Sequence, residues 1–146
     1  MNLKNKIITL KSAGGVVYKK DKNTIKWLII KPAGKKEWRL PKGLIEKNET
    51  SVKAAMREVE EEGGVKAAIK EKVGEIKYFY TQDNQKVLKT VIFFLMEYLE
   101  GDTKDHDAEV DKAVFVDFDK AYNRLTYETE KEVLAQAHEI LIGLES

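Results

Sequence analysis

Apolar and polar residues follow each other in blocks that predict strands in the first two thirds of the chain. Residues 12–18 (SAGGVVY) and 24–31 (TIKWLIIK) are rich in β-branched and apolar side chains, and a polar turn joins them. Residues 73–80 and 87–99 form a second pair around the polar segment TQDNQK. A short last strand is expected at residues 113–117 (AVFVD).

Two other segments follow the helical period of 3.6 residues. In residues 50–62, four apolar positions fall at i, i+3, i+4 and i+7 and predict one buried stripe. These positions are Val52, Ala55, Met56 and Val59. Thr50 or Ser51 can cap the start of this helix, and the glycines at 63–64 can end it. Residues 128–144 predict a second amphipathic helix, so we expect an α/β (α+β) fold with helices on a mixed sheet.

Composition narrows the class of protein. The length of 146 residues fits one domain, residues 1–146, and 42% hydrophobic residues are enough for a core. The formal net charge of +1 does not favour binding to long nucleic acid. No stretch approaches the length of a membrane span, and the first 12 residues are too short and too charged for a signal peptide. With cysteine absent as well, we expect a cytoplasmic location.

Three glutamates in the first predicted helix suggest metal chemistry. Glu58, Glu61 and Glu62 stand at i, i+3 and i+4, so they share one helix face, where they repel one another unless a cation lies among them. Carboxylate oxygens select Mg²⁺ or Mn²⁺, and Mg²⁺ commonly binds substrate phosphates as well. Arg57 is within reach of Glu61 and could bridge back to Glu49. On its own, however, the run REVEEE is more typical of a solvent-exposed acidic face.

The spacing of the whole segment 43–65 is more specific than these glutamates alone. It matches the pattern G-x5-E-x7-R-E-U-x-E-E-x-G-U, in which U is apolar, at every position. The matching residues are Gly43, Glu49, Arg57, Glu58, Val59, Glu61, Glu62, Gly64 and Val65. This pattern is the Nudix box, and the chain resembles the Nudix hydrolase family. The segments SAGGVVY, WLIIK with WRLPKG, and AVFVDFDKAYNRLTYETEKEVLAQA extend the resemblance over nearly the whole chain.

The resemblance implies an α/β/α sandwich with a central mixed sheet and a loop–helix–loop catalytic motif. It implies hydrolysis of a nucleoside diphosphate linked to another group, by metal-assisted transfer to water. Family members place divalent metals, Mg²⁺ or possible Mn²⁺, on the residues equivalent to Glu58, Glu61 and Glu62, with the carbonyl of Gly43 as a fourth contact. Glu49 and Arg57 then resemble the structural partners that support the motif.

The general base has two candidates by resemblance. Glu58 resembles the base of some family members, whereas others use a residue from a later loop, where Glu109 stands in KDHDAEVD. Glu109 also resembles an additional metal-binding glutamate of many members. An ordinary exposed loop carboxylate is the equally supported alternative for Glu109.

Residues outside the box bear on the substrate. WRLPKG resembles a stretch of diadenosine tetraphosphate hydrolases and diphosphoinositol polyphosphate phosphohydrolases, although those enzymes usually have a small residue where Arg39 stands. Lys42 precedes the first box glycine, so its ammonium group could reach a polyphosphate. In asymmetric diadenosine tetraphosphate hydrolases, tyrosines in places comparable to Tyr78, Tyr80 and Tyr127 stack on adenine, and a lysine comparable to Lys89 binds phosphate. Each tyrosine could equally be a half-buried packing residue.

The leading prediction is therefore an enzyme that hydrolyses diadenosine tetraphosphate to ATP and AMP. The alternatives within the family are sanitation of 8-oxo-dGTP and other nucleotides, and hydrolysis of ADP-ribose, diphosphoinositol polyphosphate or an RNA 5′ pyrophosphate. A non-catalytic nucleotide-sensing domain is a further alternative, which the intact box glutamates disfavour. The expected partner is a small-molecule nucleotide, without membrane or long nucleic acid, and the protein is expected to be a monomer or homodimer.

Overall fold

The computed structural model describes residues 6–146. The prediction that the first 12 residues are not a signal peptide falls partly on residues 1–5, which lie outside this range. In chain order the elements are β1 (Ile7–Asp21), β2 (Thr24–Pro32), β3 (Lys42–Leu44), α1 (Ser51–Gly63), β4 (Val65–Gln82), β5 (Gln85–Gly101), the 3₁₀ helix η2 (Thr103–Asp105), β6 (Val110–Val116), α2 (Phe118–Arg124) and α3 (Glu128–Glu145). Among these residues no helix is both long and apolar enough to span a bilayer.

The strands form one mixed sheet in the order β4-β5-β1-β2-β6, with β3 paired to β1. β1 runs parallel to β5, from the pair Ile7–Lys86 to the pair Tyr18–Glu97, and the other pairings are antiparallel. The β4–β5 hairpin turns at Asp83 and Asn84, which both have positive φ as a two-residue type I′ turn requires. The predicted mixed sheet is confirmed.

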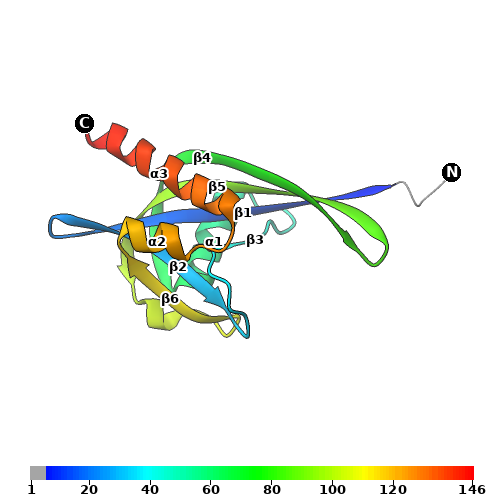
Figure 1. Ribbon diagram of the computed structural model, residues 1–146, viewed down its shortest axis with the longest axis horizontal. Coiled ribbons are helices and arrows are strands. Elements are labelled where there is room, and N and C mark those ends of the chain that lie inside the picture. Colours follow the sequence, from blue (N-terminus) through cyan, green and yellow to red (C-terminus); the bar gives the residue numbers. More distant parts are fainter. Residues whose placement is uncertain (1–5) are drawn as a thin grey trace.

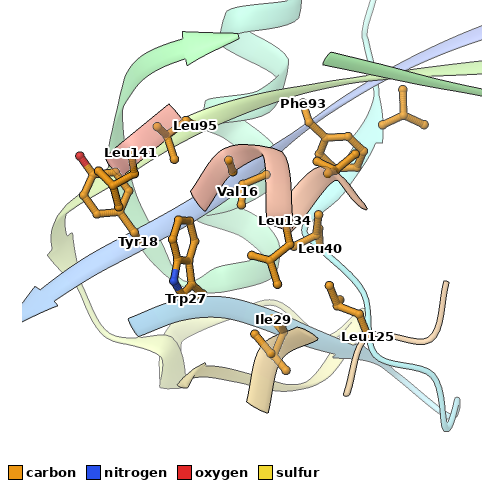
Figure 2. Packing of buried hydrophobic residues seen from close by; sticks show 14 residues of the cluster. Val16, Tyr18, Trp27, Ile29, Leu40, Phe93, Leu95, Leu125, Leu134 and Leu141 are labelled. Atoms are coloured by element: carbon orange, nitrogen blue, oxygen red, sulfur yellow. The ribbon is translucent and has the colours of Figure 1, made fainter. Parts of the chain in front are cut away.

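Helices cover both faces of this sheet. In Figure 1, α2 and α3 lie on the face toward the viewer and α1 lies behind it, while the β4–β5 hairpin and the start of β1 extend beyond these layers. The core accordingly divides into two clusters, one beneath α2 and α3 and one beneath α1. Figure 2 shows the first cluster, to which β2 contributes Trp27 and Ile29 and α3 contributes Leu134. The predicted α/β/α sandwich is confirmed.

The helix that carries the box differs from its prediction in the face that it buries. Val52 and Met56 are 37% and 42% exposed, so the predicted stripe is wrong at these two positions. Ala55 and Val59 are buried as predicted, and Ala54, which the prediction did not include, is buried with them. The reason is close packing, because small side chains let the helix approach β1, where a Cβ on Gly15 would lie 2.6 Å from Val59.

The ends of α1 agree with the predicted caps. The hydroxyl oxygen of Thr50 accepts a hydrogen bond of 3.1 Å from the backbone N–H of Lys53. Gly64 ends the helix in the left-handed region with φ of 77°, and its N–H donates to the carbonyl of Glu60. These caps fix where the helix begins and ends, and with it the direction of the box glutamates.

Candidate active site

The three box glutamates project from α1 into different surroundings. The side chain of Glu62 is 5% exposed, that of Glu58 is 12% exposed, and that of Glu61 is 45% exposed. Burial raises the pKa of the Glu58 and Glu62 carboxyl groups above its usual range, against the opposing effect of neighbouring arginines. Carboxylates removed from water need a positive partner. This face of α1 is therefore not a fully solvated acidic surface.

Gly43 lies directly against Glu58. A Cβ added to Gly43 would overlap the carboxyl group of Glu58, so a residue without a side chain is required there. Strand β3 holds Gly43 opposite Ala13 of β1, which places this contact at the sheet. The same glycine lines the cleft described below. The carboxyl group of Glu58 consequently lies beside the rim of that cleft.

Arg57 connects the helix to the segment that precedes it. Its guanidinium donates to both oxygens of Glu49, at 2.8 and 2.9 Å, and to the carbonyl of Leu44 at 3.0 Å. It also donates to Glu58 at 2.7 Å and to Glu61 at 3.3 Å. The hydrogen bonds that Glu49 accepts from Arg57, and a weaker effect of the one from the backbone N–H of Glu46, lower the pKa of Glu49 to about 2. The contacts are those expected of residues that hold the loop and helix together, and the role itself stays a prediction.

Two buried carboxylates from opposite faces of the sheet hold residues 39–42. Glu62 of α1 accepts hydrogen bonds from the Arg39 guanidinium at 3.2 and 2.8 Å and from the backbone N–H of Lys42 at 2.8 Å. Glu130 of α3 accepts from the backbone N–H of Leu40 at 2.7 Å and from the Lys42 ammonium group at 3.0 Å. Each carboxylate therefore binds one cationic side chain and one backbone amide of the same short loop.

A cleft of about 480 Å³ opens beside this loop. Its lining includes four basic side chains, two acidic ones and two aromatic rings: Lys35, Arg39, Lys42, Lys89, Glu37, Glu130, Tyr78 and Tyr127. Burial lowers the pKa of Lys89, and the positive charges of Lys42 and Arg39 lower it further. A half-buried ammonium group repelled by two other cations favours an anionic ligand.

Of the three tyrosines that the sequence suggested for base stacking, two line the cleft and one does not. Tyr78 lines it and is the cross-strand partner of Lys89, so these two residues share a face of the β4–β5 hairpin. Tyr127 lines the cleft as well, and its hydroxyl donates a hydrogen bond to Glu37. Tyr80 is not part of the lining, and its ring centroid lies 6.0 Å from that of Tyr78. Tyr78 and Tyr127 are thus the aromatic side chains available to a ligand in this cleft.

The loop that contains Glu109 contacts the end of α1 through another acidic residue. The backbone N–H of Asp107 donates to the carbonyl of Glu61 at 2.7 Å, and the negative charge of Asp107 helps to raise the pKa of Glu62. Glu109 is exposed, and its backbone groups bind the Asp107 side chain and the N–H of Ala33. Asp107, which the sequence interpretation did not consider, therefore interacts with Glu61 and Glu62, whereas the backbone of Glu109 contacts Asp107 and Ala33.

Glu130 is another residue that sequence reasoning missed. It is 1% exposed and lies one turn before Val133 and Leu134, on the buried face of α3. A charged residue on the apolar face of an amphipathic helix was the available signal, since such residues are rarely buried without a partner. Arg39 could have been noticed because related sequences usually have a small residue at this position. Nothing in the sequence pattern singled out Glu37.

The donor chemistry of the site fits a hard divalent cation. Within residues 6–146, no group of three Asp, Glu or His side chains is already close enough to hold a metal ion. Glu58 and Glu62 are nevertheless largely buried carboxylates whose charge arginines now balance, with Glu61 beside them on the helix. Oxygen donors of this kind suit Mg²⁺ and Mn²⁺. The residues present are therefore compatible with such an ion.

Comparison with known proteins identifies the family. A model of the NUDIX domain matches residues 9–137. The chain therefore belongs to the Nudix hydrolase family, as the box predicted. Members of this family generally use divalent metal ions.

Individual relatives differ in how much of their length is matched. The chain is 37% identical over 113 residues to the mutator protein MutT4 of Mycobacterium tuberculosis, covering 77% of this chain and 46% of that protein. It thus spans less than half the length of this relative. It is 26% identical over 150 residues to the asymmetrical bis(5′-nucleosyl)-tetraphosphatase of Rattus norvegicus, covering 92% of this chain and 97% of that protein.

A solved structure supports the fold. The crystal structure of a C. elegans Ap4A hydrolase binary complex superposes with a TM-score of 0.72 at 21% sequence identity. The alignment covers 92% of this chain and 98% of that one. At this identity, the similarity establishes the shared architecture.

Proposed function

We propose that this protein is a Mg²⁺-dependent Nudix pyrophosphohydrolase whose leading substrate is diadenosine tetraphosphate, hydrolysed to ATP and AMP. The observation that carries the proposal is that one cleft joins Gly43, beside the box helix, to Lys42, Lys89 and Tyr78. A dinucleoside polyphosphate offers a flat base and a chain of negative charges to these groups. The similarity to the rat tetraphosphatase over 97% of that protein's length also supports this substrate.

In this proposal the box glutamates hold the metal ion. Glu58, Glu61 and Glu62 would ligate it, with the Gly43 carbonyl and Glu109 as further ligands. When bound, such a metal neutralises diphosphate charge and lowers the pKa of a coordinated water. Mn²⁺ is the alternative to Mg²⁺, because both accept carboxylate ligands.

The protein's own side chains orient the substrate and remove the proton. Lys42 and Lys89 would bind phosphate oxygens, while Tyr78 and Tyr127, with Tyr80 behind Tyr78, would support a nucleobase. A carboxylate takes a proton from the attacking water. Glu58 is favoured for this step over Glu109, because Glu58 packs on a glycine of the cleft rim whereas Glu109 is exposed.

A substrate panel tests this proposal. The protein should be incubated with Mg²⁺ and, separately, with diadenosine tetraphosphate, 8-oxo-dGTP, ADP-ribose, a diphosphoinositol polyphosphate and 5′-triphosphate RNA, and the products should be separated by ion exchange. We expect diadenosine tetraphosphate to give ATP and AMP with the highest kcat/KM. Much faster turnover of another compound would refute the substrate assignment. An absence of turnover with every compound would favour a nucleotide-sensing domain.

Nucleotide-pool sanitation is the second candidate. The 37% identity to a mycobacterial mutator protein favours it, and hydrolysis of 8-oxo-dGTP to the monophosphate would be its signature in the same panel. A cytoplasmic enzyme formed by one domain of residues 1–146, as a monomer or homodimer, completes the proposal. Sedimentation analysis of the purified protein would determine the oligomeric state.

A further inference from the structure

Arg39 lies between the box glutamates and the cleft. Its Nη1 and Nη2 atoms bind the two oxygens of Glu62 at 3.2 and 2.8 Å, and Nη1 also donates to the carbonyl of Leu40 at 3.1 Å. The Arg39 side chain is 17% exposed and lines the cleft. It is therefore the one cationic side chain of the described cleft that contacts Glu62 directly.

Because the guanidinium of Arg39 occupies both carboxylate oxygens of Glu62, Arg39 and a metal ion would compete for the same carboxylate. A two-point contact between guanidinium and carboxylate is strong, and it balances the charge of a nearly buried Glu62. A divalent cation on the same carboxylate would stand close to the guanidinium, and like charges repel strongly where water is excluded. Binding of the cation should therefore loosen Arg39. The backbone N–H of Lys42 carries no net charge and can stay on Glu62.

The loosened guanidinium has a second anion site within the cleft. Lys42 and Lys89 line the same cleft and offer positive charge to a phosphate, and the hydrogen bond to Glu130 holds Lys42 in position. Arginine binds phosphate oxygens in the same two-point manner as it binds a carboxylate. The move from Glu62 to a phosphate thus exchanges one anionic partner for another and leaves no buried charge unpaired.

We propose that Arg39 competes with the divalent cation for Glu62 and, once displaced, binds a substrate phosphate beside Lys42 and Lys89. The inference rests on the proposed function only for the cation and the polyphosphate character of the ligand, and not for which nucleotide is cleaved. Because coupling between two ligands is reciprocal, metal and polyphosphate should strengthen each other's binding through this residue. Arg39 is then a residue that sets polyphosphate affinity.

The first half of the proposal is tested without any nucleotide. Mn²⁺ and Mg²⁺ affinities of the wild type and Arg39→Gln should be measured by calorimetry at pH 8. We expect Arg39→Gln to bind either ion about tenfold more tightly, a coupling of ordinary size. Lys89→Gln is the matched control. It also removes one positive charge from the cleft, but Glu62 is bound by the side chain of Arg39 and not by that of Lys89. Unchanged or weaker metal binding by Arg39→Gln, or equal tightening in Lys89→Gln, would overturn the competition.

The second half is tested with inorganic tripolyphosphate in the presence of saturating metal. We expect Arg39→Gln to bind it about tenfold more weakly than the wild type, with Arg39→Lys between the two because a lysine keeps the charge but loses the two-point contact. Equal affinities would overturn the phosphate role. If Arg39→Gln does not fold, Arg39→Lys serves in both measurements, with the same direction expected. A different best nucleotide in the substrate panel would refute only the substrate assignment.

Discussion

The ammonium group of Lys42 donates a hydrogen bond of 3.0 Å to Glu130, which lies 88 residues further along the chain. Glu130 is 1% exposed and also accepts a hydrogen bond from the backbone N–H of Leu40. Lys42 therefore enters the cleft with its charge already paired and its position set by the last helix. A lysine held in this way loses less conformational freedom when it binds a phosphate.

Substitution of Glu130 should show how much the Lys42–Glu130 ion pair contributes to the stability of the fold. In Glu130→Gln, the partly buried Lys42 ammonium group loses its negative partner, and we expect the free energy of unfolding to fall by about 3 kcal/mol. Urea unfolding followed by circular dichroism measures this change. Glu128→Gln is the control, since its side chain is 82% exposed and 3.9 Å from its own lysine partner. Equal stability of the two variants would contradict the structural role of Glu130.

The Glu49–Arg57 contact should make stability depend on pH in acid. The pKa of Glu49 is lowered to about 2 in the folded protein, whereas a glutamate in the unfolded chain titrates near about 4.3. The unfolded state thus binds this proton first, so the stabilisation is complete above about pH 5 and is lost as the pH falls toward 2.

Urea midpoints of the wild type and Glu49→Gln measure this dependence between pH 7 and pH 2.5. The wild type should be the more stable protein at pH 7, and the difference should shrink below about pH 4.5. Glu46→Gln provides the comparison, because its side chain is 67% exposed and 3.7 Å from Arg57. A difference that stays constant over the whole range would argue against the contact.

Removal of one box carboxylate should abolish most of the activity. We expect Glu61→Gln, and Glu62→Gln likewise, to lower kcat by at least about a hundredfold, because metal-assisted charge stabilisation is lost. Glu60→Gln, on the exposed side of the same helix, should retain kcat within about twofold of the wild type, because surface changes have small effects. Steady-state rates at saturating Mg²⁺ measure all three variants. Wild-type rates in either of the first two would refute the assigned ligands.

A methyl group at position 43 should disturb the site while leaving the fold intact. In Gly43→Ala the new Cβ overlaps the Glu58 carboxyl group, which must then move. Displacement of a functional group by about 1 Å can cost about a hundredfold in rate, so we expect a loss of that order in kcat/KM. Gly143→Ala, where nothing lies within 4 Å of the added methyl group, should keep full activity. Similar rates for the two variants would exclude the steric explanation.

Substitution of two neighbouring aromatic residues of β4, Tyr78 and Phe79, should show whether Tyr78 binds a nucleobase or only packs in the hairpin. Tyr78 lines the cleft, whereas Phe79 is 55% exposed and lies under the ammonium group of Lys86. Loss of a base stack of about 1–3 kcal/mol predicts that Tyr78→Ala raises the KM for a dinucleoside polyphosphate about tenfold, with little change in kcat. Phe79→Ala should leave KM unchanged. An equal effect in both variants would indicate a disturbed hairpin instead of a lost stack.

The sequence predicted the elements with a clear period more accurately than the short ones. Helix α1 (Ser51–Gly63) was expected at residues 50–62, and β5 (Gln85–Gly101) contains the predicted strand 87–99. Strand β3 (Lys42–Leu44) and α2 (Phe118–Arg124) were missed, because three residues or two turns carry too little periodicity. Residues Val65–Lys72 were missed as well, where charged residues interrupt the alternation of an edge strand with register shifts.

The site was predictable only where local spacing controls it. Glu58, Glu61 and Glu62 share a helix, so their common face follows from the helical period. The contacts of Glu62 with Arg39 and of Glu130 with Lys42 join residues 23 and 88 positions apart, and no local pattern reports such distances. Tyr78 and Tyr80 were indistinguishable by their spacing, because only the surrounding helix and loop decide which ring the cleft exposes.

The attachment of residues 39–42 to carboxylates on both faces of the sheet limits how the chain can change in length. One inserted residue would shift one end of this segment by about 3.3 Å, which exceeds the tolerance of a hydrogen bond. Either Glu62 or Glu130 would then lose its partner. Insertions and deletions should accordingly be rejected within residues 39–42.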